Sequence, residues 1–399
     1  MEIVPELRLS TPEATVLPES DGPLVATIRA EIEDSGPITF ARFMELALYH
    51  PERGYYATRD DRGSRTGDFL TAPETHPIFG RVVGRQLHEM WELSGRPTPY
   101  RLLEYGAGSG VLALDVLRGL VADGSELQKA LRYRPVEVSV ERSESIQRRL
   151  ADDGFGANVE RDGAAGSGCV LANEFLDALP VHRVLEREGR LQEVFVGWRD
   201  GHFVELPETP SSQALAERLA AEGVRLADGQ TAEICLGLDA WAADTAVRLE
   251  RGFMLLIDYG YPAAELYAPT RGGGTLRAYT RQRAHADPFV AIGRQDLTAH
   301  VDVTAVTTAL AARGWRAVGE TRLADFLVAL GVEDLLGSIR ADPATSPAEY
   351  LALRSGLVRM LDPRALGNFR VMAFGRGVPE GPVLRGFAGR RWVSTSPTR

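Results

Sequence analysis

A glycine-rich turn between an apolar strand and a helix is the feature that most limits how this chain can fold. Leu102 and Leu103 lead into Glu104, glycines at 106, 108 and 110 alternate with small residues, and apolar residues at helical spacing follow over 111–120. This order predicts a strand, a tight turn and a helix, an arrangement that brings backbone N–H groups against a nucleotide-like ligand. We therefore expect a parallel α/β sheet with a ligand site at this turn.

The spacing of the glycines indicates which ligand binds there. A dinucleotide-binding turn has its third glycine three positions after the second, and that position here is Val111. Glu104, Gly106, Gly108 and Gly110 instead form the E-x-G-x-G-x-G pattern typical of S-adenosylmethionine (SAM)-dependent methyltransferases. The structural alternative is a glycine turn that only packs a helix on a sheet. We predict that these four residues bind SAM.

From Tyr100 onward, strand-like and helix-like segments alternate, which favours a mostly parallel sheet. Before it, residues 1–20 are predicted to be a disordered lead and residues 21–99 a helical cap. Residues 100–399 would form a Rossmann-like domain with an insertion at about 181–250, a hairpin and helices that build a lid or a partner surface. The predicted strands are 101–105, 136–141, 158–160, 169–173, 253–258 and 369–374, the hairpin is 183–198, and the helices are 111–120, 144–151, 211–221, 238–249 and 304–313.

Composition excludes several classes of function. The chain has one lysine, Lys129, so a pyridoxal Schiff base and a phosphate-binding P-loop are poor candidates, and two cysteines cannot build a cysteine zinc site. A net charge of −10 argues against nucleic acid as a partner and mildly favours a cationic substrate. No apolar run is long enough to span a membrane, and the acidic N-terminus resembles neither a signal nor a transit peptide, so we expect a cytoplasmic protein.

Two acidic residues are predicted to contact the nucleoside part of the cofactor. Glu141 ends the predicted strand 136–141, where a carboxylate can accept hydrogen bonds from both ribose hydroxyls. Asp162 follows the short predicted strand 158–160 and could accept from the adenine amino group. A surface strand end and an ordinary Asp-Gly turn are the respective alternatives.

The segment after the predicted strand 169–173 supplies the candidate acceptor site. Asn173 and Glu174 would lie beside the sulfonium, and Glu174 and Asp177 are three residues apart, so a helical turn places them on one side. Two carboxylates suit a guanidinium, which they can hold and orient by charged hydrogen bonds. The alternative is a helix N-terminus, where acidic residues are favoured by the dipole.

Three further polar segments are candidates. They contain Gly67 and Asp68, Asp258 at the end of a buried strand, and His300 with its flanking acids. Asp258 or His300 could take the proton that the acceptor loses. No metal site is expected, since His300 and Asp302 have no matching second histidine pair and methyl transfer needs no metal.

Taken together, these motifs resemble the MidA-like SAM-dependent methyltransferases, a family that includes the mitochondrial complex I assembly methyltransferase. The resemblance spans Pro37 to about Gly375 and is carried by F-A-R-F-M-E-L-A-L-Y-H-P-E-R-G-Y-Y (40–56), G-D-F-L-T-A-P-E (67–74), E-Y-G-A-G-S-G (104–110), A-N-E-F-L-D-A-L-P (172–180), I-D-Y-G (257–260) and D-L-T-A-H-V-D (296–302).

The resemblance implies a class I methyltransferase fold with an N-terminal helical cap and an inserted lid. It also implies that the glycine loop, Glu141 and the Gly67–Asp68 segment hold SAM, while the Asn173–Asp177 turn faces the acceptor. The implied acceptor is an arginine of a partner protein, by analogy a subunit of respiratory complex I. One departure is Arg142, which follows Glu141 where the family usually has a small or polar residue.

We expect in-line methyl transfer to an arginine nitrogen, with Glu174 anchoring the guanidinium and Asp177 supporting it. Holding donor and acceptor in line supplies most of the catalysis for an already activated methyl group. Two alternatives remain: a non-catalytic assembly factor that acts by contact, and a methyltransferase for a small cationic amine.

Overall fold

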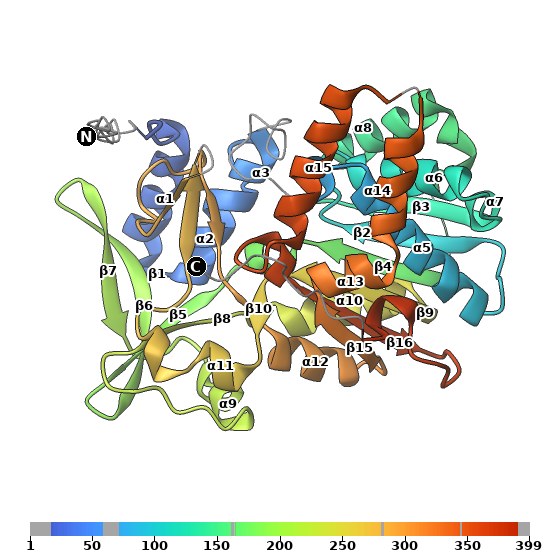
Figure 1. Cartoon of the computed structure of the whole chain (residues 1–399). Helices are drawn as coiled ribbons and strands as arrows, with labels where there is room; N and C mark the ends of the chain where they lie inside the picture. Colours follow the sequence, from blue (N-terminus) through green and yellow to red (C-terminus); the bar gives the residue numbers. More distant parts are fainter. Residues whose placement is uncertain are drawn as a thin grey trace, which may run out of the picture.

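A six-stranded sheet forms the centre of the larger half of the molecule (Figure 1). The structure is a computed structural model that describes residues 17–58, 72–160, 163, 165–280, 283–343 and 345–389. The strand order is β15-β16-β9-β4-β2-β3. In chain order the strands are β2 (Tyr100–Tyr105), β3 (Leu131–Val136), β4 (Ser167–Asn173), β9 (Arg251–Asp258), β15 (Arg316–Arg322) and β16 (Arg370–Arg376).

The sheet is mostly parallel and changes direction at one edge. β2 pairs in parallel with both β3 and β4, and β4 pairs in parallel with β9. β16 runs antiparallel to β9 and to β15. The chain leaves β2 for β3 on one side and then crosses to β4 on the other, so the carboxyl ends of β2 and β4 form a topological switch point, where open α/β sheets bind ligands. The predicted class I, Rossmann-like fold is confirmed.

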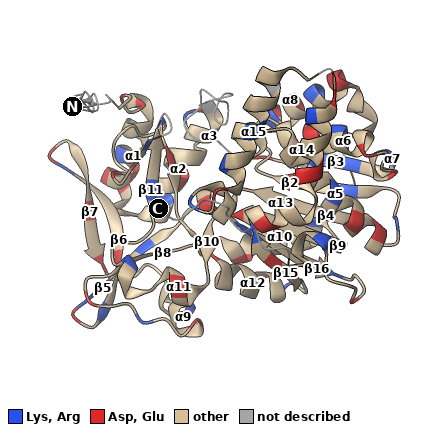
Figure 2. Cartoon of the chain, in the orientation of Figure 1, with Lys and Arg blue, Asp and Glu red and all other residues tan. Residues whose placement is uncertain are grey.

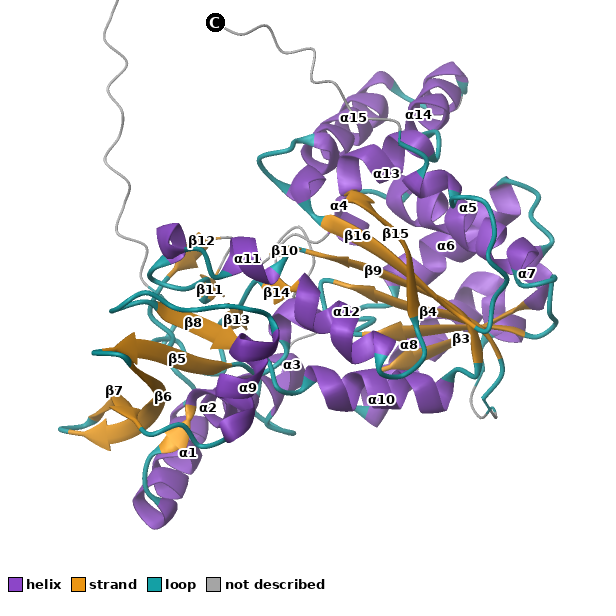
Figure 3. Ribbon diagram, turned by 90° about the horizontal axis from the view of Figure 1, so that it is seen from below, coloured by secondary structure: helices purple, strands orange, loops and turns teal. Residues whose placement is uncertain are grey.

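Helices cover both faces of this sheet (Figure 3). In β9, Phe253, Leu255 and Ile257 pack into the core on one face, and the intervening Met254 and Leu256 pack into the core on the other. A strand buried on both faces must be apolar throughout, which is why β9 was recognisable in the sequence. The covering helices are α5 (Ile78–Leu93), α6 (Val111–Ala122), α13 (Leu323–Ala329), α14 (Val332–Ala341) and α15 (Pro347–Leu361) on the first face, and α10 (Leu238–Arg248) and α12 (Val303–Ala311) on the second.

The smaller half is built from distant parts of the chain. The insertion after β4 forms an antiparallel sheet, and the N-terminal strand β1 pairs with its strand β6, Ile38 lying opposite Val196. Gly189, at φ 78°, turns the predicted hairpin. The elements are α1 (Gly22–Ser35), β1 (Ile38–Thr39), α2 (Phe40–Tyr49), α3 (Tyr55–Thr58), β5 (His182–Arg187), β6 (Arg190–Arg199), β7 (His202–Glu208), α9 (Gln213–Ala221) and β8 (Thr231–Ile234).

Several short strands follow β9, and two of them, β11 and β13, pack in one core with α1 and α2. Strand β11 pairs with β12 on one side and β13 on the other, and β10 pairs with β14. Their bounds are β10 (Gly260–Tyr261), β11 (Arg277–Thr280), β12 (Arg283–His285), β13 (Asp296–Thr298) and β14 (Val301–Asp302). The remaining helices are α4 (Ala72–Thr75), α7 (Leu127–Ala130), α8 (Val140–Leu150) and α11 (Ala263–Leu266).

One predicted strand is wrong. The second strand of the sheet is β3, Leu131–Val136, and Val140 begins helix α8 because the Ser139 side chain caps it by accepting from the Arg142 N–H. The apolar alternation of Val136, Val138 and Val140 imitated a strand, although the last two are exposed. The predicted strand 158–160 forms only a single bridge between Val159 and Tyr133.

The N-terminal segment does not pack as one unit. Helices α1 and α2 bury Leu24, Phe40 and Phe43 against the insertion, whereas α5 buries Phe79 and Val82 in the core of the larger half. The boundary expected at residue 99 therefore cuts off a helix that belongs, by its contacts, to the central sheet. No helix in the described ranges is long and apolar enough to cross a membrane.

Candidate functional site

The three loop glycines all adopt left-handed backbone angles, but for different local reasons. Gly106, Gly108 and Gly110 have φ of 66°, 58° and 75°. A Cβ atom on Gly106 would lie 2.9 Å from Phe175, and one on Gly110 would lie 2.6 Å from Ile146. A Cβ on Gly108 would meet nothing within 4 Å. Gly106 and Gly110 thus permit packing, whereas Gly108 leaves its backbone open to the adjoining cavity.

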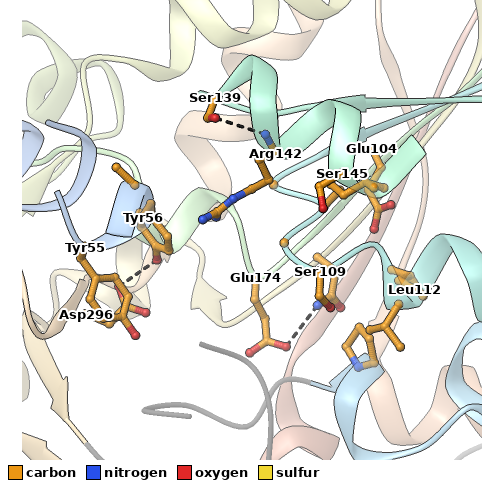
Figure 4. A pocket seen from close by; sticks show the side chains of 18 of the residues that line it. Tyr55, Tyr56, Glu104, Ser109, Leu112, Ser139, Arg142, Ser145, Glu174 and Asp296 are labelled. Atoms are coloured by element: carbon orange, nitrogen blue, oxygen red, sulfur yellow. Dashed lines mark hydrogen bonds between the residues drawn. The ribbon is translucent and has the colours of Figure 1, made fainter. Parts of the chain in front are cut away.

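A cavity of about 630 Å³ adjoins this loop at the switch point (Figure 4). It is lined by residues of the glycine loop, of α3, of the start of α8, of the turn after β4 and of β13. The lining comprises Tyr55, Tyr56, Ala57, Pro73, Glu104, Gly106, Ala107, Gly108, Ser109, Val111, Leu112, Ser139, Glu141, Arg142, Ser145, Ile146, Arg149, Asn173, Glu174, Asp177, Asp296 and Thr298. Seven of the predicted site residues are among them. The glycine loop, predicted to bind the cofactor, and the predicted acceptor turn therefore share one cavity, which we call the cofactor cavity.

Glu104 lies at the inner end of the glycine loop. Its side chain is buried and accepts a hydrogen bond of 2.6 Å from the Tyr133 hydroxyl. Burial raises the pKa of Glu104 to about 8, against the lowering effect of that hydrogen bond. A carboxyl group that is largely protonated near neutral pH can donate as well as accept a hydrogen bond.

Glu141 lines the cavity from the first turn of α8 and not from a strand end. Its carboxylate accepts from the Ser139 hydroxyl at 2.7 Å, and this bond lowers the pKa of Glu141. The acidic residue that directly follows β3 is Glu137, whose Oε1 accepts from the Gly108 N–H at 2.8 Å. Two acids thus flank the outer part of the loop, one facing the cavity and one holding the loop backbone.

The turn after β4 is held in an unusual conformation. Glu174 has φ of 51°, rare for a non-glycine residue. Its Oε1 accepts from the Ala72 N–H and from the Asn173 amide, both at 3.1 Å. Such strain persists only where the surroundings enforce it and is common at ligand sites. The turn thereby fixes Glu174 between the two walls of the cavity.

Among the buried oxygens of this turn, Oδ1 of Asn173 and Oδ1 of Asp177 accept no hydrogen bond within the described part of the chain. Burial raises the pKa of Asp177 to about 6. Buried acceptors without donors cost free energy, so these two atoms mark a place where a ligand with N–H groups would be stabilised.

Asp258 positions this turn from behind. Its Oδ2 accepts from the backbone N–H groups of Phe175, Leu176 and Asp177 at 3.2, 2.9 and 3.4 Å, and its Oδ1 accepts from that of Tyr259 at 2.9 Å. Burial, with the nearby Asp177 and Glu174 charges, raises the pKa of Asp258 well above its usual range. Asp258 is not among the residues that line the cofactor cavity.

His300 lies outside the cofactor cavity as well, between the rings of Tyr259 and Tyr261. Gly67, Asp68 and Asp162 fall outside the described residues. In the part of the chain that is described, no group of three or more His, Cys, Asp or Glu side chains is placed to hold a metal ion.

The sequence reasoning missed the wall opposite the glycine loop. There the Tyr56 hydroxyl donates to Asp296 Oδ1 at 2.8 Å (Figure 4). The Tyr56 ring also stacks on the Tyr49 ring, with ring centres 5.3 Å apart. Both Tyr56 and Asp296 stand in segments that carry the family resemblance. The signal was therefore available, but in the second segment His300 drew the assignment instead of Asp296.

Comparison with known proteins places the chain in a family. The family described as "Putative S-adenosyl-L-methionine-dependent methyltransferase" matches residues 82–321. The chain belongs to this family. It is a SAM-dependent methyltransferase of the MidA-like kind, as the resemblance of its motifs predicted.

Relatives and solved structures cover most of the chain. The protein arginine methyltransferase NDUFAF7 homolog of Drosophila melanogaster, a mitochondrial protein, is 32% identical over 92% of this chain and 88% of its own length. The human NDUFAF7 protein is 27% identical over 87% and 81%. A COG1565 superfamily protein from Burkholderia thailandensis, whose crystal structure contains S-adenosyl-homocysteine, has a TM-score of 0.81 and 34% identity, covering 92% of this chain and 94% of its own.

Proposed function

We propose that this methyltransferase transfers the methyl group of SAM to a guanidinium nitrogen of an arginine in a partner protein. The observation that carries the proposal is the pair of buried acceptors, Asn173 Oδ1 and Asp177 Oδ1, in the cavity that contains the glycine loop. A guanidinium presents five N–H donors in one plane and no acceptor. The names of the relatives, which are protein arginine methyltransferases, point to the same acceptor.

The described residues fit SAM. Gly108 leaves space at the loop backbone, and Glu141 offers an acceptor for ribose hydroxyls from the rim of the cavity. Glu104, Gly106 and Gly110 form the rest of the loop, and SAM supplies the activated methyl group when bound. Asn173, at the end of β4, would lie beside the reacting end of SAM. Gly67, Asp68 and Asp162 remain sequence-based candidates for the same ligand.

Two carboxylates bind the acceptor guanidinium. Glu174 anchors the guanidinium and Asp177 supports it, since charged hydrogen bonds of this kind both attract and orient. With a pKa of about 6, Asp177 is mostly ionised at neutral pH. Tyr56 and Asp296 close the opposite wall.

The guanidinium stays protonated in water, so its proton leaves during or after methyl transfer. Within the cavity, Asp177 is the carboxylate best placed to receive it. Asp258 already accepts four backbone N–H groups, and His300 lies outside the cavity. Asp258 therefore positions the turn that carries Asp177.

The identity of the partner protein is a separate prediction. A respiratory-complex subunit is the acceptor that the family resemblance suggests. The two NDUFAF7 relatives are mitochondrial, and the cytoplasmic location expected for this chain stays a prediction.

A methylation assay tests the proposal. The full chain is incubated with labelled SAM and a protein extract from its own organism, and acid hydrolysates are analysed for methylated arginines. We expect methylarginine with the wild type and at least about a tenfold loss with Asp177→Asn, because one buried charged hydrogen bond contributes about 1.5–3 kcal/mol. Binding of S-adenosyl-homocysteine, measured by calorimetry, should be retained.

Asp239→Asn is the matched control, since Asp239 is an exposed acid on α10 that pairs with Arg218 away from the cavity. Label found only on small amines would contradict the arginine assignment. Full activity of Asp177→Asn would refute the role of Asp177.

A further inference from the structure

A second cavity, of about 450 Å³, lies beside the cofactor cavity. Its aromatic wall consists of Tyr259, Tyr261, Tyr279, His300 and Phe369. The Tyr259 ring contacts both His300 and Phe369, with ring centres 5.2 and 5.3 Å apart. We call it the arginine–aromatic cavity, because its other wall carries arginines.

Three arginines line the opposite wall: Arg322, Arg359 and Arg364. Arg364 pairs with Asp362, whereas Arg322 and Arg359 form no ion pair within the described ranges. Acidic and basic residues are both spread over both halves of the molecule (Figure 2). Arg322 and Arg359, two arginines at one cavity without an acidic partner in the described chain, therefore form a local feature of the surface. Arg322 donates through Nη1 to the Asn368 carbonyl at 2.8 Å, a bond that does not neutralise its charge. Guanidinium groups without a carboxylate partner at a cavity favour an anionic ligand.

The nearest acids do not neutralise this wall. Glu320 and Glu265 lie near Arg322, but both pair with the buried Arg370, and neither lines the cavity. Arg370 also donates through Nε to the Gly260 carbonyl. Burial and the charge of Arg370 lower the pKa of Arg322, the direction expected of a cation without a carboxylate partner.

His300 adds a neutral polar group to the aromatic wall. Its Nδ1 is buried and makes no hydrogen bond in the described part of the chain. Burial lowers the pKa of His300 to about 4, and the charges of Arg271 and Arg277 act in the same direction. A neutral imidazole with Nδ1–H can therefore donate to a ligand in this cavity.

The two cavities share a wall. Tyr279, which lines the arginine–aromatic cavity, is paired across the strands β11 and β13 with Asp296, which lines the cofactor cavity. Residues paired in this way have Cα atoms about 5 Å apart. Tyr259, which lines the arginine–aromatic cavity, also lies close to Asp177, which lines the cofactor cavity. Burial raises the pKa of Tyr259, and the nearby Asp177 charge raises it further.

We propose that the arginine–aromatic cavity binds an acidic side chain of the acceptor polypeptide, about one to four residues from the arginine that is methylated. The spacing follows from the shared wall, because an extended chain advances about 3.3–3.6 Å per residue. The acceptor arginine enters the cofactor cavity, and its acidic neighbour enters the arginine–aromatic cavity. This inference rests on the proposed function and adds a sequence requirement to the substrate.

A peptide series tests it. Each fluorescent peptide carries one arginine and one glutamate at one to four positions on either side, and a matched peptide carries glutamine instead. Dissociation constants are measured with the full chain saturated with S-adenosyl-homocysteine, and methylation rates are measured with SAM. At the correct spacing, we expect the glutamate peptide to bind about tenfold more tightly than its glutamine partner, as a charged hydrogen bond predicts.

Two arginine variants and one control locate the effect. Arg359→Gln and Arg322→Gln should each remove most of the preference for glutamate. Arg359 is exposed on α15, so its replacement leaves the fold intact. Arg354→Gln, at another exposed position of α15 that does not line the cavity, should keep the preference.

The outcomes separate this inference from the proposed function. Equal binding of glutamate and glutamine peptides at every spacing would overturn it, as would an equal loss with Arg354→Gln and Arg359→Gln. A glutamate preference that depends on Arg359 supports the cavity assignment even if no methyl group is transferred. Methylation of arginine without any such preference would support the enzyme and overturn the cavity assignment.

Discussion

Gly108 offers a direct test of where the cofactor lies. Gly108 and Gly124 both have left-handed backbone angles, φ 58° and 64°, and a Cβ atom on either would meet nothing within 4 Å. Alanine at either position should therefore cost a similar folding free energy, about 1–2 kcal/mol, from the left-handed conformation alone. Only Gly108 faces the cofactor cavity.

The binding effect is expected to differ between the two variants. A methyl group at 108 occupies space that SAM needs, and inserting such a group into a filled site costs about 1–3 kcal/mol. That corresponds to about a 5- to 150-fold weaker affinity. Gly124→Ala, in the turn after α6, should bind as the wild type does. Calorimetric titration with S-adenosyl-homocysteine measures both, and urea unfolding measures their stabilities.

Gly110→Ala completes the comparison. Its added Cβ would lie 2.6 Å from Ile146, so its loss of stability should exceed that of Gly108→Ala by about 1–3 kcal/mol. Wild-type affinity of Gly108→Ala for S-adenosyl-homocysteine would refute the argument that this backbone meets the cofactor.

Three other predictions concern the acids of the site. Asp258→Asn should lower the free energy of unfolding by about 2–3 kcal/mol, because its amide leaves at least one buried backbone N–H unpaired; urea unfolding measures this, and unchanged stability would contradict a positioning role. Methyl transfer should fall about tenfold between pH 7 and pH 5, because Asp177, with a pKa of about 6, loses its charge as the pH falls; a profile with the same acidic limb in Asp177→Asn would assign that limb to another group. Glu141→Gln should weaken binding of S-adenosyl-homocysteine about tenfold while keeping the fold, as expected for one charged hydrogen bond to ribose; titration of this variant beside Glu137→Gln shows which acid contacts the ligand.

The sequence predicted elements best where burial imposed a simple pattern. β9 is buried on both faces and was visible as a continuous apolar run. β3 was missed because it is an edge strand in which Arg132, Arg134 and Pro135 interrupt the apolar residues. The exposed Val138 and Val140 after it supplied a false alternation.

The site was predictable where its residues are close in sequence. The glycine loop and the turn from Asn173 to Asp177 each follow one strand, so the rule for parallel sheets brings them together. The contact between Tyr56 and Asp296 joins residues 240 positions apart. No local pattern encodes such a pair, because the contact depends on how the segment after β9, which carries β13, folds back over the N-terminal helices.

The pairing of β1 with β6 has a consequence for synthesis of the chain. Helices α1 and α2 bury Phe40 and Phe43 in a core that also requires Val196 and Leu297. Ribosomes add about 5–20 residues per second, so the segment ending at residue 58 waits about 7–28 s before β6 is complete at Arg199. During that interval the first two helices expose apolar faces with no partner yet made. The newborn chain therefore carries exposed apolar faces on α1 and α2 that the finished protein buries.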